Sequence, residues 1–386
     1  MPPVPMTNSM TQLLGAWLKP VKDKLPADFG PEESEALYQA ITQESLRRFD
    51  SFLKGLRFYQ SHSSSRAETS EVLTLWEKGT TRLLDYAPSS GGPVIFVVPS
   101  LVNRFDILDI DPQHSFLGFL ASVGLRPLVV DWQEPGEEEK GFSLSTYMTE
   151  RLFPALIEAQ RANGGRPCHL LGYCMGGVMA LALAQLQPQA IRSLTLMATP
   201  WDFAPKGVGG VPASSTELGQ AFLKQALSWE KALEEVGLLP PELLQTVFIN
   251  FQSLSVLQKF MRFGDALMPD EARRFVLTED WLNDGVPLSL PVARECLHDW
   301  YVQNAPAKGR WKLAGQKIDP SRINVPTYLM IPQRDKIVPP ESALPLAATI
   351  PNATVHEPNM GHIGLMTGEE APSKVWAPFA MWLYKQ

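Results

Sequence analysis

The chain has few cysteines and no long apolar run, and each shortage excludes a class of protein. Three cysteines in 386 residues cannot form a disulfide framework, and no spacing of cysteine and histidine suggests a zinc site. No apolar stretch approaches the roughly 20 residues that span a bilayer. The first residues also lack the basic start and apolar stretch of a signal peptide. We therefore expect a cytoplasmic protein without a membrane span or a metal site.

The chain also lacks a positive charge excess. Its net charge of −7 argues against nucleic acid or an anionic membrane as the main partner. A hydrophobic content of 45% and a charged content of 19% are ordinary for a globular enzyme. The length allows one large domain with an insertion, or two domains.

Short apolar runs alternate with helical stretches from about residue 72 onward. Continuous apolar runs suit strands that are buried on both faces of a parallel sheet. The β-α-β alternation predicts a doubly wound, mostly parallel α/β sheet. We expect such strands at 94–98, 128–130, 194–197 and 328–331, with helices at 114–123 and 145–162.

Two parts of the chain do not follow this alternation. Helix formers fill residues 31–60, and amphipathic segments such as 216–228 and 242–265 interrupt the pattern later. A long insertion between late strands is expected to form a cap over the functional site. We predict an N-terminal helical segment at 1–71, an α/β core at 72–202 and 322–386, and a cap insertion at 203–321.

One short segment carries most of the chemical information. The residues 172–177 (GYCMGG) follow an apolar run and precede a run of helix formers. A strand, a sharp Gly-x-nucleophile-x-Gly turn and a helix form the nucleophile elbow of the α/β-hydrolase fold. Glycines flank the turn because a Cβ there would collide with the neighbouring strand and helix. Cys174 is therefore the predicted nucleophile, whereas Cys168 and Cys296 lack this frame and are expected to be inert core thiols.

An elbow nucleophile needs a base, and the base needs an orienting acid. In this fold the chain order is nucleophile, acid, histidine. Asp335 directly follows the apolar run 327–331, and His362 lies between glycines farther along. The sequence therefore predicts a triad of Cys174, Asp335 and His362. Asp202, which follows the strand predicted around 194–197, is the main rival acid.

The other five histidines have plainer interpretations. His169 lies in the strand before the elbow and is expected to be packed. His356 lies in a predicted strand without a special turn, and His298 lies in the predicted cap. His62 and His114 precede the elbow, contrary to the expected order.

Two main-chain N–H groups are predicted to form an oxyanion hole. One belongs to Met175, directly after the nucleophile, and the other to the loop 99–105 after the first core strand. Within this loop Leu101 or Val102 is the expected donor, with Val102 preferred. Such a preorganised donor contributes a few kcal/mol to lowering the barrier.

A thiol at the elbow narrows the predicted chemistry. A thiolate is a good nucleophile and a good leaving group, so acyl groups can move on and off it reversibly. Cys174 therefore favours acyl transfer from a donor such as acyl-CoA, with His362 taking the thiol proton. Hydrolysis remains an alternative, because cysteine hydrolases also exist.

Several motifs resemble those of the polyhydroxyalkanoate synthases, the catalytic subunits that polymerise (R)-3-hydroxyacyl-CoA. The resemblance covers about residues 94–382, and the elbow with the Asn-containing loop is its most specific part. The motifs are residues 102–109 (VNRFDILD), 172–177 (GYCMGG), 280–285 (DWLNDG), 300–304 (WYVQN), 335–339 (DKIVP) and 361–364 (GHIG).

The resemblance implies a role for each triad residue. Cys174 would hold the growing chain as a thioester and His362 would activate Cys174. Asp335 would orient His362 or help to deprotonate the incoming hydroxyl group. It further implies no cofactor, hydroxyacyl-CoA as the substrate, a polyester product, a homodimer, a partner subunit and a location at the polymer granule surface.

The chain departs from the family pattern in three places. Lys336 stands where the family often has histidine, and the residues after His362 lack the Asn-Pro-Pro ending of the longer synthases. The short leading segment is nearer to the synthases that work with a separate subunit. A thioesterase or intracellular polyester depolymerase with a cysteine nucleophile is therefore the alternative, and a granule-binding protein without activity is a third hypothesis.

Overall fold

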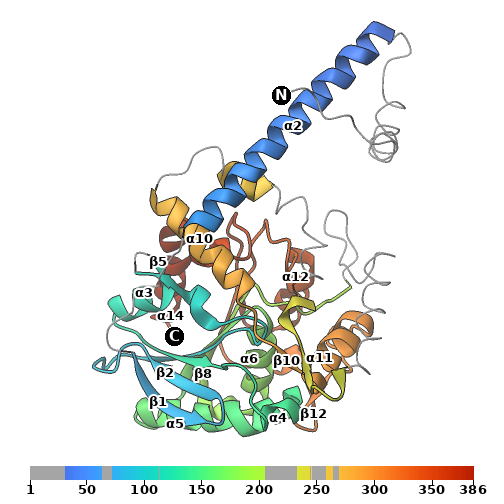
Figure 1. Cartoon of the computed structure of the whole chain (residues 1–386). Coiled ribbons are helices and arrows are strands. Elements are labelled where there is room, and N and C mark those ends of the chain that lie inside the picture. The colour runs from blue at the N-terminus through green and yellow to red at the C-terminus, as the bar shows by residue number, and fades with distance from the viewer. Residues whose placement is uncertain are drawn as a thin grey trace. The chain divides into compact units, whose positions relative to one another are not determined.

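The computed structural model describes residues 31–62, 72–112, 114–204, 233–243, 245, 258–263 and 269–386. Its main feature is an eight-stranded sheet (Figure 1). The first two strands in the spatial order pair antiparallel, and the other six run parallel to one another. The spatial order is β1 (Leu73–Lys78), β2 (Thr81–Asp85), β6 (Arg126–Asp131), β3 (Val94–Val98), β7 (Cys168–Tyr173), β8 (Ile191–Met197), β13 (Thr327–Met330) and β14 (Ala353–His356).

The central strands are buried because apolar side chains pack on both faces of the sheet. In β3, Val94, Phe96 and Val98 join one core cluster, and the alternate residues Ile95 and Val97 join a second. This alternation follows from the two-residue period of a strand. The continuous apolar runs predicted to be buried strands are therefore confirmed, as is the mostly parallel α/β-hydrolase sheet.

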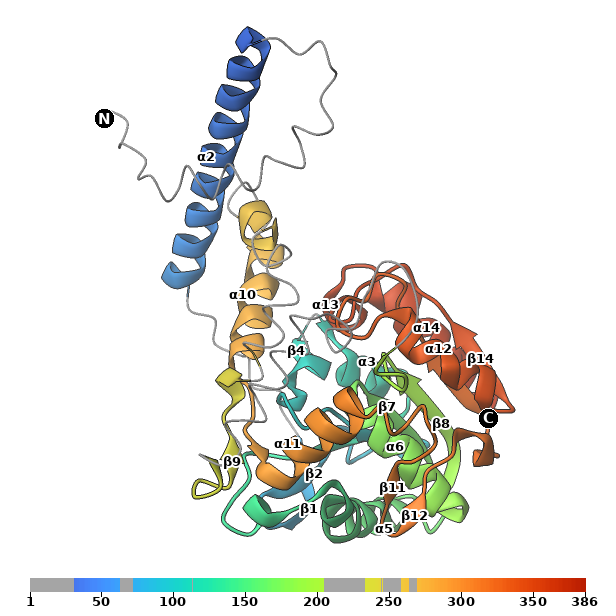
Figure 2. The same cartoon turned by 90° about the vertical axis from the view of Figure 1, so that its right-hand side faces the viewer.

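Helices supply the other half of each core cluster. Residues of α5 (Phe153–Ala162) and α6 (Met175–Leu186) belong to the first cluster, and residues of α3 (Phe116–Ser122) and α14 (Ala377–Leu383) to the second. The helices predicted at 114–123 and 145–162 are confirmed, although the latter is divided. Figure 2 shows α12 beside β14. Further elements of this part are η1 (Phe105–Leu108), β4 (Asp109–Asp111), β5 (His114–Ser115), η2 (Glu139–Gly141), α4 (Leu144–Tyr147), η3 (Met148–Leu152), η4 (Pro188–Ala190), η7 (Pro320–Arg322), α12 (Pro340–Thr349), α13 (Gly364–Thr367) and η8 (Pro372–Trp376).

The antiparallel hairpin of β1 and β2 was not anticipated from the sequence. Its turn depends on Gly79, whose φ of 56° is left-handed. A Cβ at Gly79 would lie 2.1 Å from Oε1 of Glu139, which also accepts the N–H of Thr80 at 3.2 Å. The hairpin is thus held by a carboxylate about 60 residues away in the chain, which no local pattern reveals.

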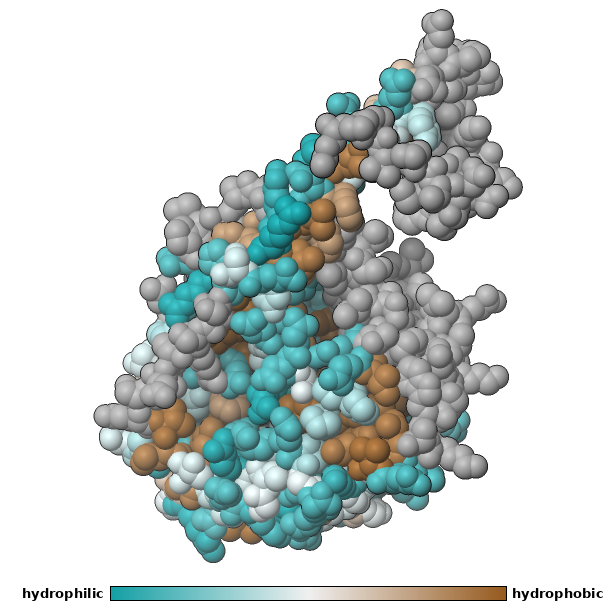
Figure 3. Space-filling model, in the orientation of Figure 1, coloured by the Kyte–Doolittle hydropathy of each residue, from teal (hydrophilic) through white to brown (hydrophobic). Residues whose placement is uncertain are grey.

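Within the described chain, residues 31–61 and 258–263 belong to a separate unit. Within it α2 (Pro31–Ser61) confirms the predicted N-terminal helix. Phe260 packs edge-on against Phe52 and Tyr59, with ring centroids about 6 Å apart, and Phe263 packs against Phe58 at 4.8 Å. Figure 3 shows hydrophobic and hydrophilic residues mixed along the described part of this helix.

The predicted cap insertion is only partly described. The predicted helix at 216–228 lies outside the described residues, as does most of the segment 242–265. The division of the chain at 71, 202 and 321 therefore stays a prediction. Described elements of the insertion are β9 (Leu238–Leu239), α10 (Pro269–Asn283), β10 (Leu288–Ser289), α11 (Leu290–Arg294), the π-helical turn η6 (Glu295–Val302), β11 (Lys312–Leu313) and β12 (Gln316–Lys317). Across the described ranges, no helix combines the length and apolarity that crossing a bilayer requires.

A glutamate joins the insertion to the core. Oε1 of Glu295 accepts the N–H of Leu144, at the start of α4, at 2.9 Å. Burial raises the pKa of Glu295 to about 7. The hydrogen bond from Leu144 opposes this shift, and the nearby negative charge of Asp299 adds to it.

This raised pKa predicts a pH-dependent stability. The folded protein binds the proton of Glu295 more tightly than the unfolded chain does, so its contribution to stability is present at low pH and is lost as the pH rises through about 7. Glu295→Gln keeps an acceptor oxygen and removes the titration. We expect this variant to exceed the wild type by about 1–2 kcal/mol in free energy of unfolding at pH 8 and to match it near pH 4.5.

Urea unfolding at both pH values measures the effect. Glu137→Gln is the matched control, because its carboxylate is 90% exposed. The expected difference for this control is small at both pH values. An equal gain at both pH values for Glu295→Gln would contradict the assignment.

Candidate active site

The elbow holds Cys174 in an unusual backbone conformation. Cys174 lies between β7 and α6 with φ of 56° and ψ of −127°, a combination that residues with a side chain rarely adopt. Its N–H donates to the carbonyl of Met197 at 2.9 Å, and its carbonyl accepts the N–H of Gly177 at 2.9 Å. These two bonds hold a strained residue at the end of a central strand, as functional sites commonly do.

The flanking glycines are required by close approach. A Cβ on Gly172 would lie 2.4 Å from Cα of Gly177 in the following helix, and one on Gly176 would lie 2.2 Å from the carbonyl oxygen of Val98 in β3. Both distances are far shorter than a van der Waals contact. The steric reason for the glycines that the sequence predicted is confirmed.

Asp335 and His362 form a buried hydrogen-bonded pair. Nδ1 of His362 lies 2.7 Å from Oδ2 of Asp335. The other carboxylate oxygen, Oδ1, accepts the N–H groups of Ile337 and Val338, both at 2.8 Å. Both oxygens of Asp335 are therefore engaged, which fixes the carboxylate and with it the orientation of the imidazole ring. The two residues follow β13 and β14, neighbouring parallel strands whose carboxyl ends lie at one edge of the sheet.

The charges around His362 favour its protonated form. Burial alone lowers the pKa of His362, but the charges of Asp335 and Cys174 and hydrogen bonds to both raise it to about 10. An imidazole with this pKa takes a thiol proton readily. Cys174 and His362 are thus electrostatically coupled, and among the interactions that raise the pKa of His362 the charge of Asp335 has the largest effect.

The rival acid Asp202 has different partners. Its Oδ1 accepts Nδ2 of Asn304 at 2.8 Å and the N–H of Ala204 at 2.9 Å. Oδ1 of Asn304 in turn accepts the N–H of Phe203 at 3.0 Å. Asp202 therefore anchors the start of the insertion and does not contact His362 through a hydrogen bond in the described structure.

The other two thiols, and the histidines at 169 and 356, are buried or hydrogen-bonded in ways that indicate structural roles. Burial raises the pKa of Cys168 to about 12 and also raises that of Cys296, which disfavours a thiolate at either position. His169 lies within hydrogen-bonding distance of Oγ of Ser193, at 2.8 Å, and burial lowers its pKa to about 4. His356 bonds a backbone carbonyl at 2.8 Å.

The two predicted oxyanion donors differ in their surroundings. Met175 is the first residue of α6, where backbone N–H groups lack intrahelical acceptors. The N–H of Val102 donates to Oγ of Ser100 at 3.3 Å, a long bond that an oxyanion would have to replace. The assignment of both donors stays a prediction.

Two tyrosines that the sequence did not mark as functional lie at the triad. The hydroxyl of Tyr173 donates to the carbonyl of His362 at 3.2 Å, and the two rings lie 5.2 Å apart. Burial, together with the charges of Cys174 and Cys296, raises the pKa of Tyr301. This raised pKa keeps the hydroxyl of Tyr301 in its protonated form. Neither residue is predicted as functional from the sequence, since Tyr173 is the variable residue of the elbow and Tyr301 lies in the motif 300–304 without an assigned role.

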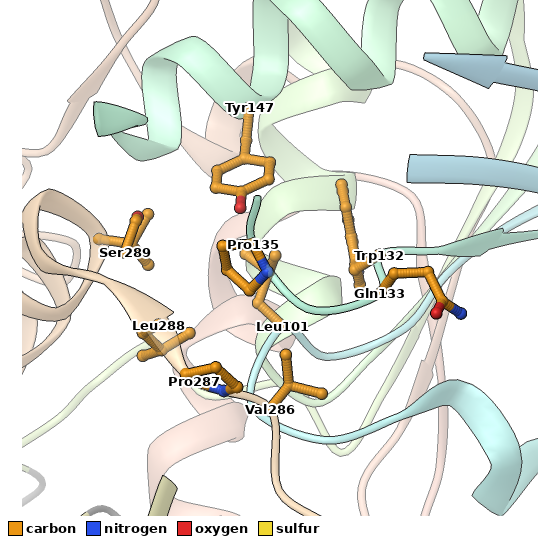
Figure 4. A pocket seen from close by; sticks show the side chains of 10 residues that line it. Leu101, Trp132, Gln133, Pro135, Tyr147, Val286, Pro287, Leu288 and Ser289 are labelled. Carbon is orange, nitrogen blue, oxygen red and sulfur yellow. The ribbon is translucent and has the colours of Figure 1, made fainter. Parts of the chain in front are cut away.

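A small pocket adjoins the loop 99–105 (Figure 4). Leu101, Trp132 and Leu288 contribute to its mostly apolar wall, and the hydroxyl of Tyr147 points into it. Of the described residues that line it, none belongs to the predicted triad. Among the described parts of the chain, no cluster of three His, Cys, Asp or Glu side chains suits a metal ion.

The family model of the alpha/beta hydrolase fold matches residues 113–369, more than half of the chain. The protein therefore belongs to the α/β-hydrolase fold family. Within it the chain is similar to proteins named poly(3-hydroxyalkanoate) polymerase subunit PhaC, which confirms the predicted resemblance.

Three of these relatives show how far the similarity extends. That of Haloferax mediterranei is 28% identical over 337 residues, covering 83% of this chain and 67% of the relative. That of Allochromatium vinosum is 28% identical over 301 residues, covering 77% and 82%. That of Synechocystis sp. is 26% identical over 352 residues, covering 88% and 92%.

The pair of Asp335 and His362 gives a direct pH prediction. In the wild type His362 is expected to stay protonated well above its usual pKa, so its contribution to stability is complete below pH 6.5 and is lost as the pH rises through about 10. Asp335→Asn removes the main opposing charge. We expect the pKa of His362 to fall in this variant, measured by NMR titration of the ring protons.

Asp202→Asn is the matched control, because it alters the rival acid. It is expected to leave the titration of His362 unchanged. A fall in the pKa of His362 with Asp202→Asn and none with Asp335→Asn would reverse the assignment of the acid.

Proposed function

We propose that this protein is an acyltransferase that polymerises (R)-3-hydroxyacyl-CoA into polyhydroxyalkanoate through an acyl-Cys174 intermediate. The observation that carries the proposal is the strained cysteine elbow next to the buried pair of His362 and Asp335. The similarity to poly(3-hydroxyalkanoate) polymerase subunits supports the choice of substrate.

The first half-reaction loads the cysteine. In the resting enzyme His362 already holds the proton that Cys174 has given up, and the thiolate attacks the carbonyl carbon of the acyl-CoA thioester. The N–H groups of Met175 and Val102 stabilise the negative charge that develops on the carbonyl oxygen. The carbon–sulfur bond to CoA then breaks, and the proton on His362 passes to the departing CoA thiolate.

The second half-reaction extends the chain. His362 accepts the proton from the 3-hydroxyl group of another hydroxyacyl unit, and the resulting oxygen attacks the acyl-Cys174 carbonyl. An ester forms, and Cys174 leaves as a thiolate while His362 keeps the proton. Asp335 orients His362 and compensates its positive charge, because hydrogen bonds already engage both of its carboxylate oxygens. This supports the orienting role over direct deprotonation of the hydroxyl group.

Hydrolysis is the second candidate. Water would replace the hydroxyl group in the second step, giving a free acid instead of an ester. The departure from the synthase pattern after His362, where Ile363 and Gly364 follow, favours this alternative. Both candidates use the same acyl-Cys174 intermediate and differ only in the acceptor.

The proposal also covers the location, the oligomeric state and the partners of the enzyme. We propose a cytoplasmic protein at the surface of polymer granules that works as a homodimer with a partner subunit and needs no cofactor. The name of the relatives, which are called polymerase subunits, supports the partner.

Incubation of the full chain with (R)-3-hydroxybutyryl-CoA tests the function. We expect CoA release together with an ester-linked product, measured by thiol titration and by mass spectrometry of the products. Cys174→Ala is expected to lower CoA release by about a thousandfold or more, since the nucleophile is lost.

Cys168→Ala is the matched control, because it removes a buried thiol outside the elbow. It is expected to retain activity. Free 3-hydroxybutyrate as the sole product would favour the hydrolase, and CoA release unaffected by Cys174→Ala would contradict both candidates.

A further inference from the structure

Residues of the insertion bind the backbone of the loop that carries the proposed oxyanion donor. Nε1 of Trp281, in α10, donates to the carbonyl of Arg104 at 2.7 Å. The N–H of Val286 donates to the carbonyl of Val102 at 3.1 Å. A β-bridge pairs Asn103 with Gly285 between these two bonds. Three successive residues of the loop, 102–104, are therefore bound by one short segment, 281–286.

Two ion pairs of Arg104 add to these backbone contacts. Nε of Arg104 lies 2.8 Å from Oδ2 of Asp284, and its terminal nitrogen lies 2.8 Å from Oε1 of Glu134. Both carboxylates are more than half exposed, so solvent screens these pairs and each contributes little. The indole and backbone hydrogen bonds therefore account for most of the restraint on the loop.

The same loop also contacts the elbow. It follows β3, whose last residue, Val98, is paired with Gly172 of β7. The absence of a side chain on Gly176 lets the elbow helix pack against the carbonyls of Val98 and Pro99. The loop thus contacts the elbow at 98–99 and the insertion at 102–104. In Figure 4, Val286 lies close to Leu101 at the wall of the pocket.

We propose that Trp281 is a positioning residue, with Asp284 in support, that holds the main chain at 102–104 so that the N–H of Val102 can exchange its long bond to Ser100 for one to the acyl carbonyl oxygen on Cys174. This inference rests on the proposed acyl transfer. Trp281 acts on the reaction through the loop and not by contact with the reacting atoms. A small displacement of an oxyanion donor reduces catalysis strongly, because its effect depends on geometry.

The proposed role can be separated from a general effect on folding. Acyl transfer develops negative charge on a carbonyl oxygen, whereas alkylation of Cys174 by iodoacetamide displaces iodide and forms no oxyanion. Loss of the restraint should therefore slow acyl transfer and leave alkylation unchanged. Substrate binding should also change little, since the donor acts in the transition state.

Trp281→Phe tests this role, because it keeps an aromatic ring and removes the donor N–H. We expect kcat for CoA release to fall about tenfold and KM to change by less than about threefold. The rate of alkylation of Cys174 by iodoacetamide should match the wild type. Asp284→Asn should lower kcat by only about twofold to threefold, as its ion pair is exposed.

Trp376→Phe is the matched control. It also loses an indole hydrogen bond to a backbone carbonyl, that of Leu365 at 2.9 Å, in the core away from the loop. We expect it to reduce stability and to leave kcat unchanged. Equal losses of kcat in the two variants, or a parallel loss of kcat and alkylation rate in Trp281→Phe, would overturn the positioning role.

Hydrogen exchange separates this inference from the proposed function. If the wild type releases no CoA, the proposed function fails, yet the restraint on the loop can still be measured. Amide exchange within residues 100–105 should be faster in Trp281→Phe than in the wild type and Trp376→Phe. Unchanged exchange in this loop would overturn the restraint whatever the activity.

Discussion

The hydrogen bond between His362 and Asp335 is the interaction on which the rest of the site depends. It joins two loops that follow neighbouring parallel strands, and it is buried, so both partners keep a fixed orientation. Two backbone N–H groups fix the carboxylate from the other side. This arrangement turns His362 from a weak base into one that holds a proton firmly next to Cys174. The reactivity that we expect of Cys174 then follows from the position of its thiol beside His362.

The sheet makes this arrangement possible. The carboxyl ends of the parallel strands lie at one edge of the sheet. Cys174, Asp335 and His362 therefore lie at the same edge, although they are far apart in the chain. Cys174 stays in its strained conformation because the glycines let the helix approach β3 and because the carbonyl of Met197 binds its N–H. The insertion contributes from outside the sheet by holding the loop 102–104. The fold thus positions Cys174, His362 and the loop by three different means.

Much of this could be predicted because the signals are local. The apolar runs indicate the buried strands, and the pattern GYCMGG requires a strand, a turn and a helix in that order. Chain order then selects Asp335 and His362. The pairing of Asp202 with Asn304 could not be predicted, since the two residues lie 102 positions apart. The same holds for Trp281, whose bond to the loop after β3 is visible only in three dimensions.

Acyl transfer through Cys174 requires that the substrate becomes covalently attached to its sulfur atom. The most direct measurement is peptide mapping by mass spectrometry after an acid quench of the wild type with (R)-3-hydroxybutyryl-CoA. We expect a hydroxyacyl thioester on the peptide that contains Cys174, released by neutral hydroxylamine and absent in Cys174→Ala. Turnover of the substrate with the adduct on another residue, or with none, would rule out Cys174 as the acyl carrier.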